Sequence, residues 1–212
     1  SWNLVDSLGS ISRAVWFSRG DDGLLYRFSD PGITRSTDEG ISWQPTPITE
    51  GMPRNGSGLL VLNDGSIYIL SEGIRRSNDG GATFVRSDSM MATGNSSSLA
   101  IDGAGILYNI YGSSGITRST DRGDTWGVPG RDSISQTTRF SDLCVTPSGK
   151  LYALNGTGLL RSDDGGERFV QLTTPASVVG CVAAPDESII INTWASGSFQ
   201  STDGGTSWSA IR

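Results

Sequence analysis

Histidine is absent from this 212-residue sequence, and lysine is nearly absent, because Lys150 is the only lysine among 16 basic residues. Without histidine the chain lacks the side chain that most often acts as a general base and as a metal ligand. Acidic residues number 22, which gives a net charge of −6. Such a charge disfavours nucleic acid and anionic membranes as partners. We therefore expect no metal, no cofactor and no nucleic-acid partner.

Cysteine and long apolar runs are also scarce. The two cysteines, Cys144 and Cys181, are too few for a disulfide framework. They fall at the same place in neighbouring repeats of the sequence, so we expect two buried free thiols. No apolar run approaches the roughly 18 residues that a membrane-spanning helix requires, so we expect no membrane insertion.

Glycine, in contrast, is abundant, with 29 residues and no Gly-x-y period, which indicates many turns. Five of these glycines belong to a repeated Ser-x-Asp-x-Gly-x-x-Trp/Phe motif with a period of about 40 residues, which is typical of a propeller blade. The motif residues are Ser36, Asp38, Gly40, Trp43; Ser77, Asp79, Gly81, Phe84; Ser119, Asp121, Gly123, Trp126; Ser162, Asp164, Gly166, Phe169; and Ser201, Asp203, Gly205, Trp208.

The motif has the chemistry of a structural hairpin turn. Ser and Asp side chains bond backbone groups within turns, and the glycine suits a positive φ. The aromatic residue at the end can pack under the turn as an apolar anchor. Five copies in register resemble the Asp-box, or BNR, repeat of sialidases, sortilin-type receptors and several propeller lectins. The resemblance implies a β-propeller in which the motif joins the third and fourth strands of each blade.

The remainder of each repeat fits four short strands, which we name A to D. Apolar pairs such as Leu107-Tyr108 and Leu151-Tyr152 lie between turn residues, and another apolar run precedes each pair. No segment has a convincing helical period. We predict one all-β domain over residues 1–212, a propeller of five four-stranded blades. The expected repeats are 8–48, 55–90, 95–130, 137–173 and 176–212.

The N-terminus adds one feature to this pattern. Residues 1–5 (Ser-Trp-Asn-Leu-Val) look like a D strand without its turn, which predicts an extra N-terminal strand. A five-blade ring closed by strand exchange needs only one terminal D strand. The surplus strand therefore predicts either a strand packed outside the ring or a fragment of a longer chain, and an arc of a larger propeller is the alternative fold.

The sequence gives little support for a sialidase-like catalytic site. Tyr26-Arg27-Phe28 only partly matches the Tyr-Arg-Ile-Pro signature of that family, and Tyr26 has counterparts in other repeats. The repeated Asp residues belong to separate blades, whereas glycosidases need two carboxyl groups about 5–10 Å apart. We therefore expect no catalytic residues.

Binding residues are expected where the repeats differ. In a propeller the A–B and C–D turns share one face, and the B–C turns and D–A loops share the other. The D–A loops are the long, variable ones, and loops on a rigid scaffold concentrate binding residues. The candidate ligand-binding residues on that face are Trp194, Tyr111, Arg54, Arg131 and Arg139. An alternative interpretation is that Trp194 and Tyr111 only fill wedges between blades.

Three functions remain open from the sequence. The favoured one is a non-catalytic binding module that recognises a glycan or a protein surface through the B–C/D–A loop face. The first alternative is a structural or receptor-binding domain of a larger assembly, such as a phage tail or surface adhesin. The second is a sialidase-like glycoside hydrolase fragment. An extracellular, cell-surface or virion location is favoured.

Overall fold

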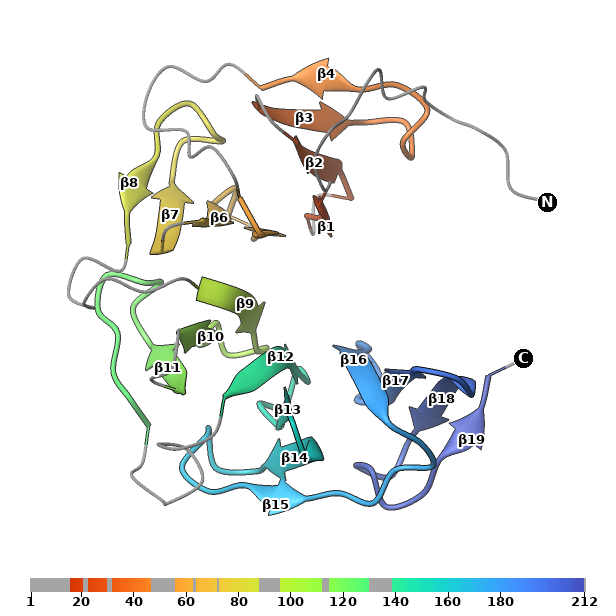
Figure 1. The fold of residues 1–212 in the computed structure, drawn as a ribbon. Coiled ribbons are helices and arrows are strands. Elements are labelled where there is room, and N and C mark those ends of the chain that lie inside the picture. The colour runs from red at the N-terminus through yellow and green to blue at the C-terminus, as the bar shows by residue number, and fades with distance from the viewer. Residues whose placement is uncertain are drawn as a thin grey trace. The chain divides into compact units, whose positions relative to one another are not determined.

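The computed structural model describes residues 16–20, 23–29, 32–46, 56–62, 64–71, 73–87, 96–111, 115–129 and 139–211. These residues form strands and turns, and none of them is helical. The strands build five antiparallel sheets, each of which follows the chain in simple meander order (Figure 1). The sheets belong to two compact units, Ser1–Ser96 and Ser97–Arg212, which are described in turn.

The first unit holds blades 1 and 2, each a four-stranded sheet. Their A strands are in contact, and the backbone N–H of Val61 donates a hydrogen bond of 3.1 Å to Ser18 Oγ. Phe28 of blade 1 and Ile69 of blade 2 are buried in the apolar core between the two sheets. The strands are β1 (Trp16–Arg19), β2 (Leu25–Ser29), β3 (Gly32–Ser36) and β4 (Gln44–Pro45), then β5 (Gly58–Val61), β6 (Ile67–Ser71), β7 (Gly73–Ser77) and β8 (Val85–Arg86).

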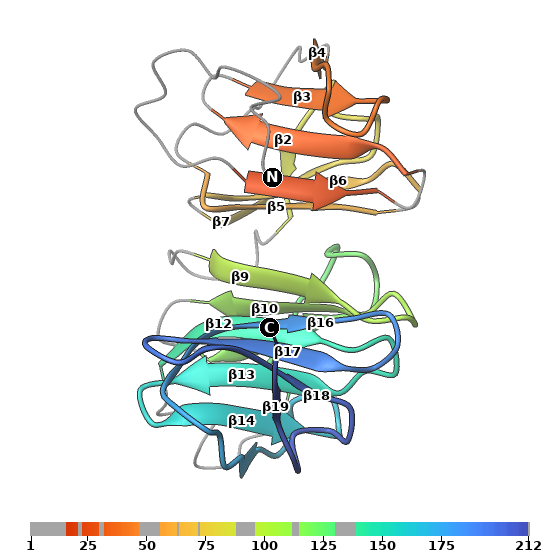
Figure 2. The same cartoon turned by 90° about the vertical axis from the view of Figure 1, so that its right-hand side faces the viewer.

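The second unit holds blades 3, 4 and 5. Figure 2 shows β12, β13 and β14 of blade 4 running side by side. The strands of blade 3 are β9 (Ser96–Ile101), β10 (Leu107–Tyr111) and β11 (Ile116–Ser119). Those of blade 4 are β12 (Phe140–Val145), β13 (Leu151–Asn155), β14 (Gly158–Ser162) and β15 (Val170–Gln171). Those of blade 5 are β16 (Val178–Ala183), β17 (Ile189–Thr193), β18 (Gly197–Ser201) and β19 (Ser209–Ala210).

The sheet of blade 3 has three strands among the described residues, whereas the other sheets have four. Where the fourth strand would lie, the backbones of Arg118 and Gly127 exchange two hydrogen bonds of 2.8 Å. The bridge has the same register as the Arg161–Val170 pair of blade 4. Pro129 follows two residues later and cannot donate a backbone bond, which fits the reduction of this strand to one bridge.

The B strand of blade 4 is apolar on both faces because this sheet lies between the sheets of blades 3 and 5. In β13, Leu151 and Ala153 pack toward blade 3, while Tyr152 and Leu154 pack toward blade 5. All four side chains are buried. Side chains on a strand alternate between its faces, so a strand with two buried faces carries a continuous apolar run.

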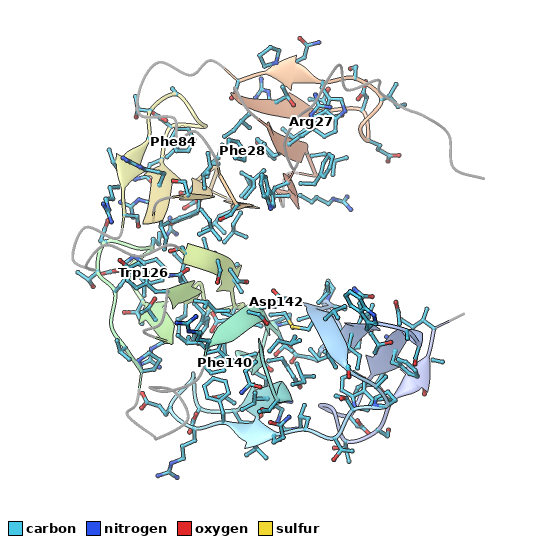
Figure 3. All side chains as sticks on the ribbon, in the orientation of Figure 1. Arg27, Phe28, Phe84, Trp126, Phe140 and Asp142 are labelled. Atoms are coloured by element: carbon cyan, nitrogen blue, oxygen red, sulfur yellow. The ribbon has the colours of Figure 1, made fainter. Side chains whose placement is uncertain are left out.

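Polar side chains also link neighbouring A strands of the second unit. Asp142 Oδ2 on β12 accepts a hydrogen bond of 3.1 Å from the backbone N–H of Cys181 on β16. Asp142 Oδ1 accepts one of 2.9 Å from Leu143 N, at a register shift in β12. Figure 3 labels Asp142 beside β16. A carboxylate is thereby held between two blades by backbone donors.

The two cysteines are buried free thiols, as expected. Their predicted equivalence within the repeat is wrong, however. Cys144 pairs across the sheet with Tyr152, whereas Cys181 pairs with Ile191, one residue out of step. Because side chains alternate, this offset turns Cys144 toward blade 5 and Cys181 toward blade 4, and both enter the same apolar cluster.

The all-β propeller with five blades is therefore confirmed, with a single bridge in place of the fourth strand of blade 3. Each sheet lies inside one predicted repeat, and the repeat boundaries stay predictions. The predicted extra strand over residues 1–5 lies outside the described residues.

Candidate functional site

The Ser-x-Asp-x-Gly turns have one hydrogen-bond pattern in all five blades. In blade 5, Ser201 Oγ donates to Asp203 Oδ1 at 2.8 Å and accepts from Gly205 N at 2.7 Å. Asp203 Oδ1 in turn accepts from Ser207 N at 2.9 Å. The glycine has a φ of 88°, a left-handed conformation that favours glycine. The serine hydroxyl and the carboxylate therefore close the turn with side-chain bonds to its backbone.

The turn carboxylates are poor candidates for acid catalysis. Hydrogen bonds from Ser207, followed by those from Ser201, lower the pKa of Asp203 to about 2. The corresponding bonds lower the pKa of Asp38, Asp79 and Asp121 to about 2 as well. A catalytic acid needs a pKa raised toward the working pH, whereas these groups are ionised and already bonded to their own turns.

The arginine before the turn serine links blades 4 and 5. Arg161 Nη1 donates a hydrogen bond of 2.7 Å to the carbonyl of Gly204 in the next turn. Its Nε and Nη2 also contact Asp163 Oδ2, at 3.1 and 2.8 Å. In blade 5 the equivalent residue, Gln200, instead donates to Ser188 of its own sheet. The turn face of these blades is thus occupied by structural bonds.

The opposite ends of blades 4 and 5 carry the most exposed aromatic side chain of the described residues. Trp194 lies in the turn between β17 and β18, and 84% of its surface is exposed. Thr193 Oγ1 donates to the carbonyl of Gly197 at 2.7 Å and accepts from Ser196 N at 3.2 Å. The backbone N–H of Trp194 donates a hydrogen bond of 3.1 Å to the carbonyl of Ser177. The turn that carries the indole is therefore held in place by three hydrogen bonds.

A shallow depression of 270 Å³ lies at the same end of these two blades. It is formed by the β13–β14 turn and by the loop that leads into β16. The Trp194–Ser177 backbone bond places the Trp194 turn beside it. Its lining has only neutral side chains and comprises Asn155, Gly156, Thr157, Gly158, Thr174, Ala176, Ser177 and Val178.

Arg139 shares this end of blade 4. It is exposed and directly precedes Phe140, which pairs with Asn155 across the sheet. Tyr111 ends β10 in blade 3 but is only 5% exposed, so its side chain is not presented to a ligand in solvent. Arg54 and Arg131 lie outside the described residues. Of the five candidate residues, Trp194 and Arg139 are thus the exposed ones that the structure places at the loop end of blades 4 and 5.

Arg27, which belongs to the partial sialidase signature, contacts side chains of its own blade. The residue is 9% exposed, and its guanidinium lies 4.5 Å from the ring centroid of Trp43. Its Nε donates a hydrogen bond of 3.1 Å to Thr34 Oγ1. Figure 3 labels it in blade 1. Its guanidinium is therefore enclosed by its own blade instead of being presented to solvent.

Sequence reasoning missed the polar residues of the depression. Asn155 and Ser177 could have been found because they flank B–C and D–A positions, and Asn155 also begins an Asn-Gly-Thr sequon. Among the described residues, no group of three potential metal ligands occurs. The described part of the chain also contains no apolar helix of membrane-spanning length.

Comparison with known proteins supports the fold. No protein-family model and no curated protein sequence matches the chain. Solved structures do match, among them "YCF48 bound to D1 peptide", with a TM-score of 0.66 and 18% identity over 91% of this chain and 65% of that one. YCF48 from Cyanidioschyzon merolae matches with a TM-score of 0.65 and 16% identity, over 91% of this chain and 70% of that one.

A glycoside hydrolase is also similar in structure. The GH74 enzyme of Niastella koreensis matches with a TM-score of 0.67 and 21% identity, over 93% of this chain. The chain spans only 31% of that enzyme and 65% of the peptide-bound YCF48. At these identities the similarity shows a propeller fold and no particular activity.

Proposed function

We propose that this protein is a non-catalytic binding module whose ligand, a glycan or a protein surface, contacts the B–C/D–A loop ends of blades 4 and 5. The observation that carries the proposal is Trp194, an indole that is 84% exposed on a turn fixed by hydrogen bonds. Tryptophan is enriched among residues that dominate binding energy, and a turn already held by hydrogen bonds reduces the backbone entropy lost on binding.

The exposed indole is large enough to matter energetically. A tryptophan can bury roughly 150–250 Å² in a contact, and burial contributes about 25 cal/mol per Å². A ligand that covered the exposed 84% of Trp194 could thus gain about 3–5 kcal/mol. The measured gain would be smaller, because association itself costs free energy.

The chemistry of the described residues favours binding over catalysis. The sequence has no histidine, and the turn carboxylates are ionised and hydrogen-bonded within their own blades. Arg27 is enclosed beside Trp43. These features count against a sialidase-like hydrolase fragment, although a GH74 enzyme is among the structural neighbours.

We propose further that the five turns are Asp boxes in the family sense. The support is the repeated set of bonds from serine hydroxyl to carboxylate and from glycine N–H to serine hydroxyl. A place within a larger extracellular assembly is the second candidate function. It is supported by neighbours such as the extracellular domain of a putative hybrid two-component system from B. thetaiotaomicron, of which this chain spans 28%.

The test is a binding screen with the intact chain. Immobilised protein is exposed to an array of glycans and to a library of surface-displayed peptides, in parallel with the Trp194→Ala variant. We expect ligands whose retention falls when Trp194 is replaced. Retention that is the same for both proteins across the two libraries would refute a binding role for this surface.

A further inference from the structure

We propose that the depression beside Trp194 is a subsite for one ring of a neutral glycan, with the indole as its stacking platform. This inference rests on the proposed binding function and deepens it by naming the ligand class. Its four supports are an exposed indole on a hydrogen-bonded turn, unused hydrogen-bonding groups, a lining without charge, and the size of the depression.

The backbone of the turn that carries the indole is fixed before any ligand arrives. Thr193 and Ser196 brace the turn from within, and Ser177 holds it from the loop that leads into β16. The aliphatic face of a sugar ring carries C–H groups, and an aromatic face with its negative quadrupole complements them. The indole of Trp194 is not part of the lining, but it is 84% exposed on a turn bonded to Ser177, which does line the recess, and so it can offer such a face to a ring seated there.

The recess also offers hydrogen-bonding groups that the fold leaves unused. Asn155 Oδ1 accepts bonds from Thr157 N at 2.8 Å and Thr157 Oγ1 at 2.7 Å, which fixes the amide plane. The Asn155 amide then has both Nδ2 hydrogens to donate, and among the described residues they have no partner. Ser177 Oγ is likewise unbonded within the described part of the chain. An amide donor and a hydroxyl that both donates and accepts suit sugar hydroxyl groups.

The lining favours a neutral ligand over an acidic one. No residue of the depression is charged. An acidic sugar in this recess would lose hydration of its carboxylate with no cation in the lining to offset the loss. Arg139 lies outside the lining, although it is on the same end of blade 4. An acidic ligand would therefore depend on Arg139 for binding, whereas a neutral one would not.

The size of the depression points to a single ring of a longer chain. Its 270 Å³ lies just below the range of about 300–1,000 Å³ for small-molecule pockets. A ligand of several sugars would place one ring here and extend over the surface around Trp194.

The experiment measures binding of cellohexaose, xylohexaose, mannohexaose and trigalacturonate to the whole chain by calorimetry. At least one neutral hexasaccharide should bind. Trp194→Ala should lower the affinity for it about ten-fold or more, which is equivalent to about 1.4 kcal/mol of binding free energy. Trp194→Phe should retain most of the affinity, because a ring remains. Asn155→Asp keeps the acceptor for Thr157 but removes the Nδ2 donors, so it should also weaken binding several-fold.

One variant serves as a control and another distinguishes the ligand class. Val170→Ala removes an apolar side chain that is 65% exposed on β15 of blade 4 and is not part of the lining, so it should leave affinity unchanged. Arg139→Ala tests whether the exposed cation at this end of blade 4 takes part, and a neutral ligand held by the recess predicts a change in affinity of less than two-fold. Binding of trigalacturonate alone, or neutral binding that depends on Arg139 and not on Trp194, would overturn the inference.

Failure of this inference differs from failure of the proposed function. If no neutral hexasaccharide binds while displayed peptides are retained in a Trp194-dependent way, the glycan subsite is wrong and the binding surface stands. If glycan binding is unaffected by Trp194→Ala, the ligand class stands and the subsite is wrong. If neither library depends on Trp194, both proposals fail.

Discussion

Replacing Ser201 by alanine tests how much a single hydroxyl contributes to the turn of blade 5. Ser201 is 1% exposed, and its Oγ donates to Asp203 Oδ1 and accepts from the backbone N–H of Gly205. Alanine removes one oxygen and leaves the backbone conformation accessible. The change therefore isolates the hydrogen bonds with little change in packing.

The expected loss follows from the bond to Gly205. That bond is 2.7 Å long and buried, and without the hydroxyl the N–H of Gly205 has lost its acceptor. A buried donor left without a partner costs about 1–3 kcal/mol, whereas the exposed side of Asp203 can be hydrated instead. For a chain of this size, each kcal/mol corresponds to a shift in Tm of roughly 2–4 °C. We therefore expect Tm to fall by roughly 2–12 °C.

The assay is thermal and urea unfolding followed by circular dichroism, with Thr202→Ala as the control. Thr202 is the exposed neighbour in the same turn, and its replacement should change stability by less than about 0.5 kcal/mol. A Ser201→Ala variant as stable as the Thr202→Ala control would show that the hydroxyl does not hold the turn, and the structural reading of the motif would be wrong.

Three further outcomes are expected. The pKa of Asp203 is lowered from 3.8 to about 2 in the folded chain, so its contribution to stability is present above pH 3.8 and lost toward pH 2. Asp203→Asn should therefore flatten the dependence of Tm on pH in that window, and an unchanged slope would contradict the assignment. Gly205→Ala should cost about 2 kcal/mol in urea unfolding, since φ is 88° and a leucine methyl would lie 2.6 Å from the new Cβ. Gly197→Ala, with φ of 79° and open space, should cost less, and equal losses would exclude a steric contribution. Cys144 and Cys181 are each 7% exposed, so a thiol reagent should modify them only after unfolding, and rapid labelling of the native chain would refute their burial.

The fold could be predicted because its signals are local. Each turn closes through side chains within seven residues of one another, as in Ser201, Asp203 and Ser207, so the motif carries its own structure. The paired apolar residues Leu151 and Tyr152 of β13 similarly report a sheet buried on both faces. Because both patterns occur five times at nearly constant spacing, they predict five sheets of the same kind.

The candidate site was only partly predictable, since exposure depends on neighbours that are distant in sequence. Tyr111 and Trp194 both end B strands or begin B–C turns and look alike in the sequence, yet one is 5% and the other 84% exposed. Asp142 and Cys181 are joined although nothing in their local sequence pairs them. The recess itself combines residues of blade 4 with the loop into blade 5.

The sequence by itself determined the strand pattern, the turns and the five-fold repeat of the sheets, because each depends on contacts within about 40 residues. The tertiary structure alone decided which side chains remain in solvent. A one-residue offset turned Cys144 and Cys181 toward each other, and Tyr111 is buried whereas Trp194 is exposed. Burial is a property of packed surfaces, and packing between sheets is not encoded in the periodicity of any single strand.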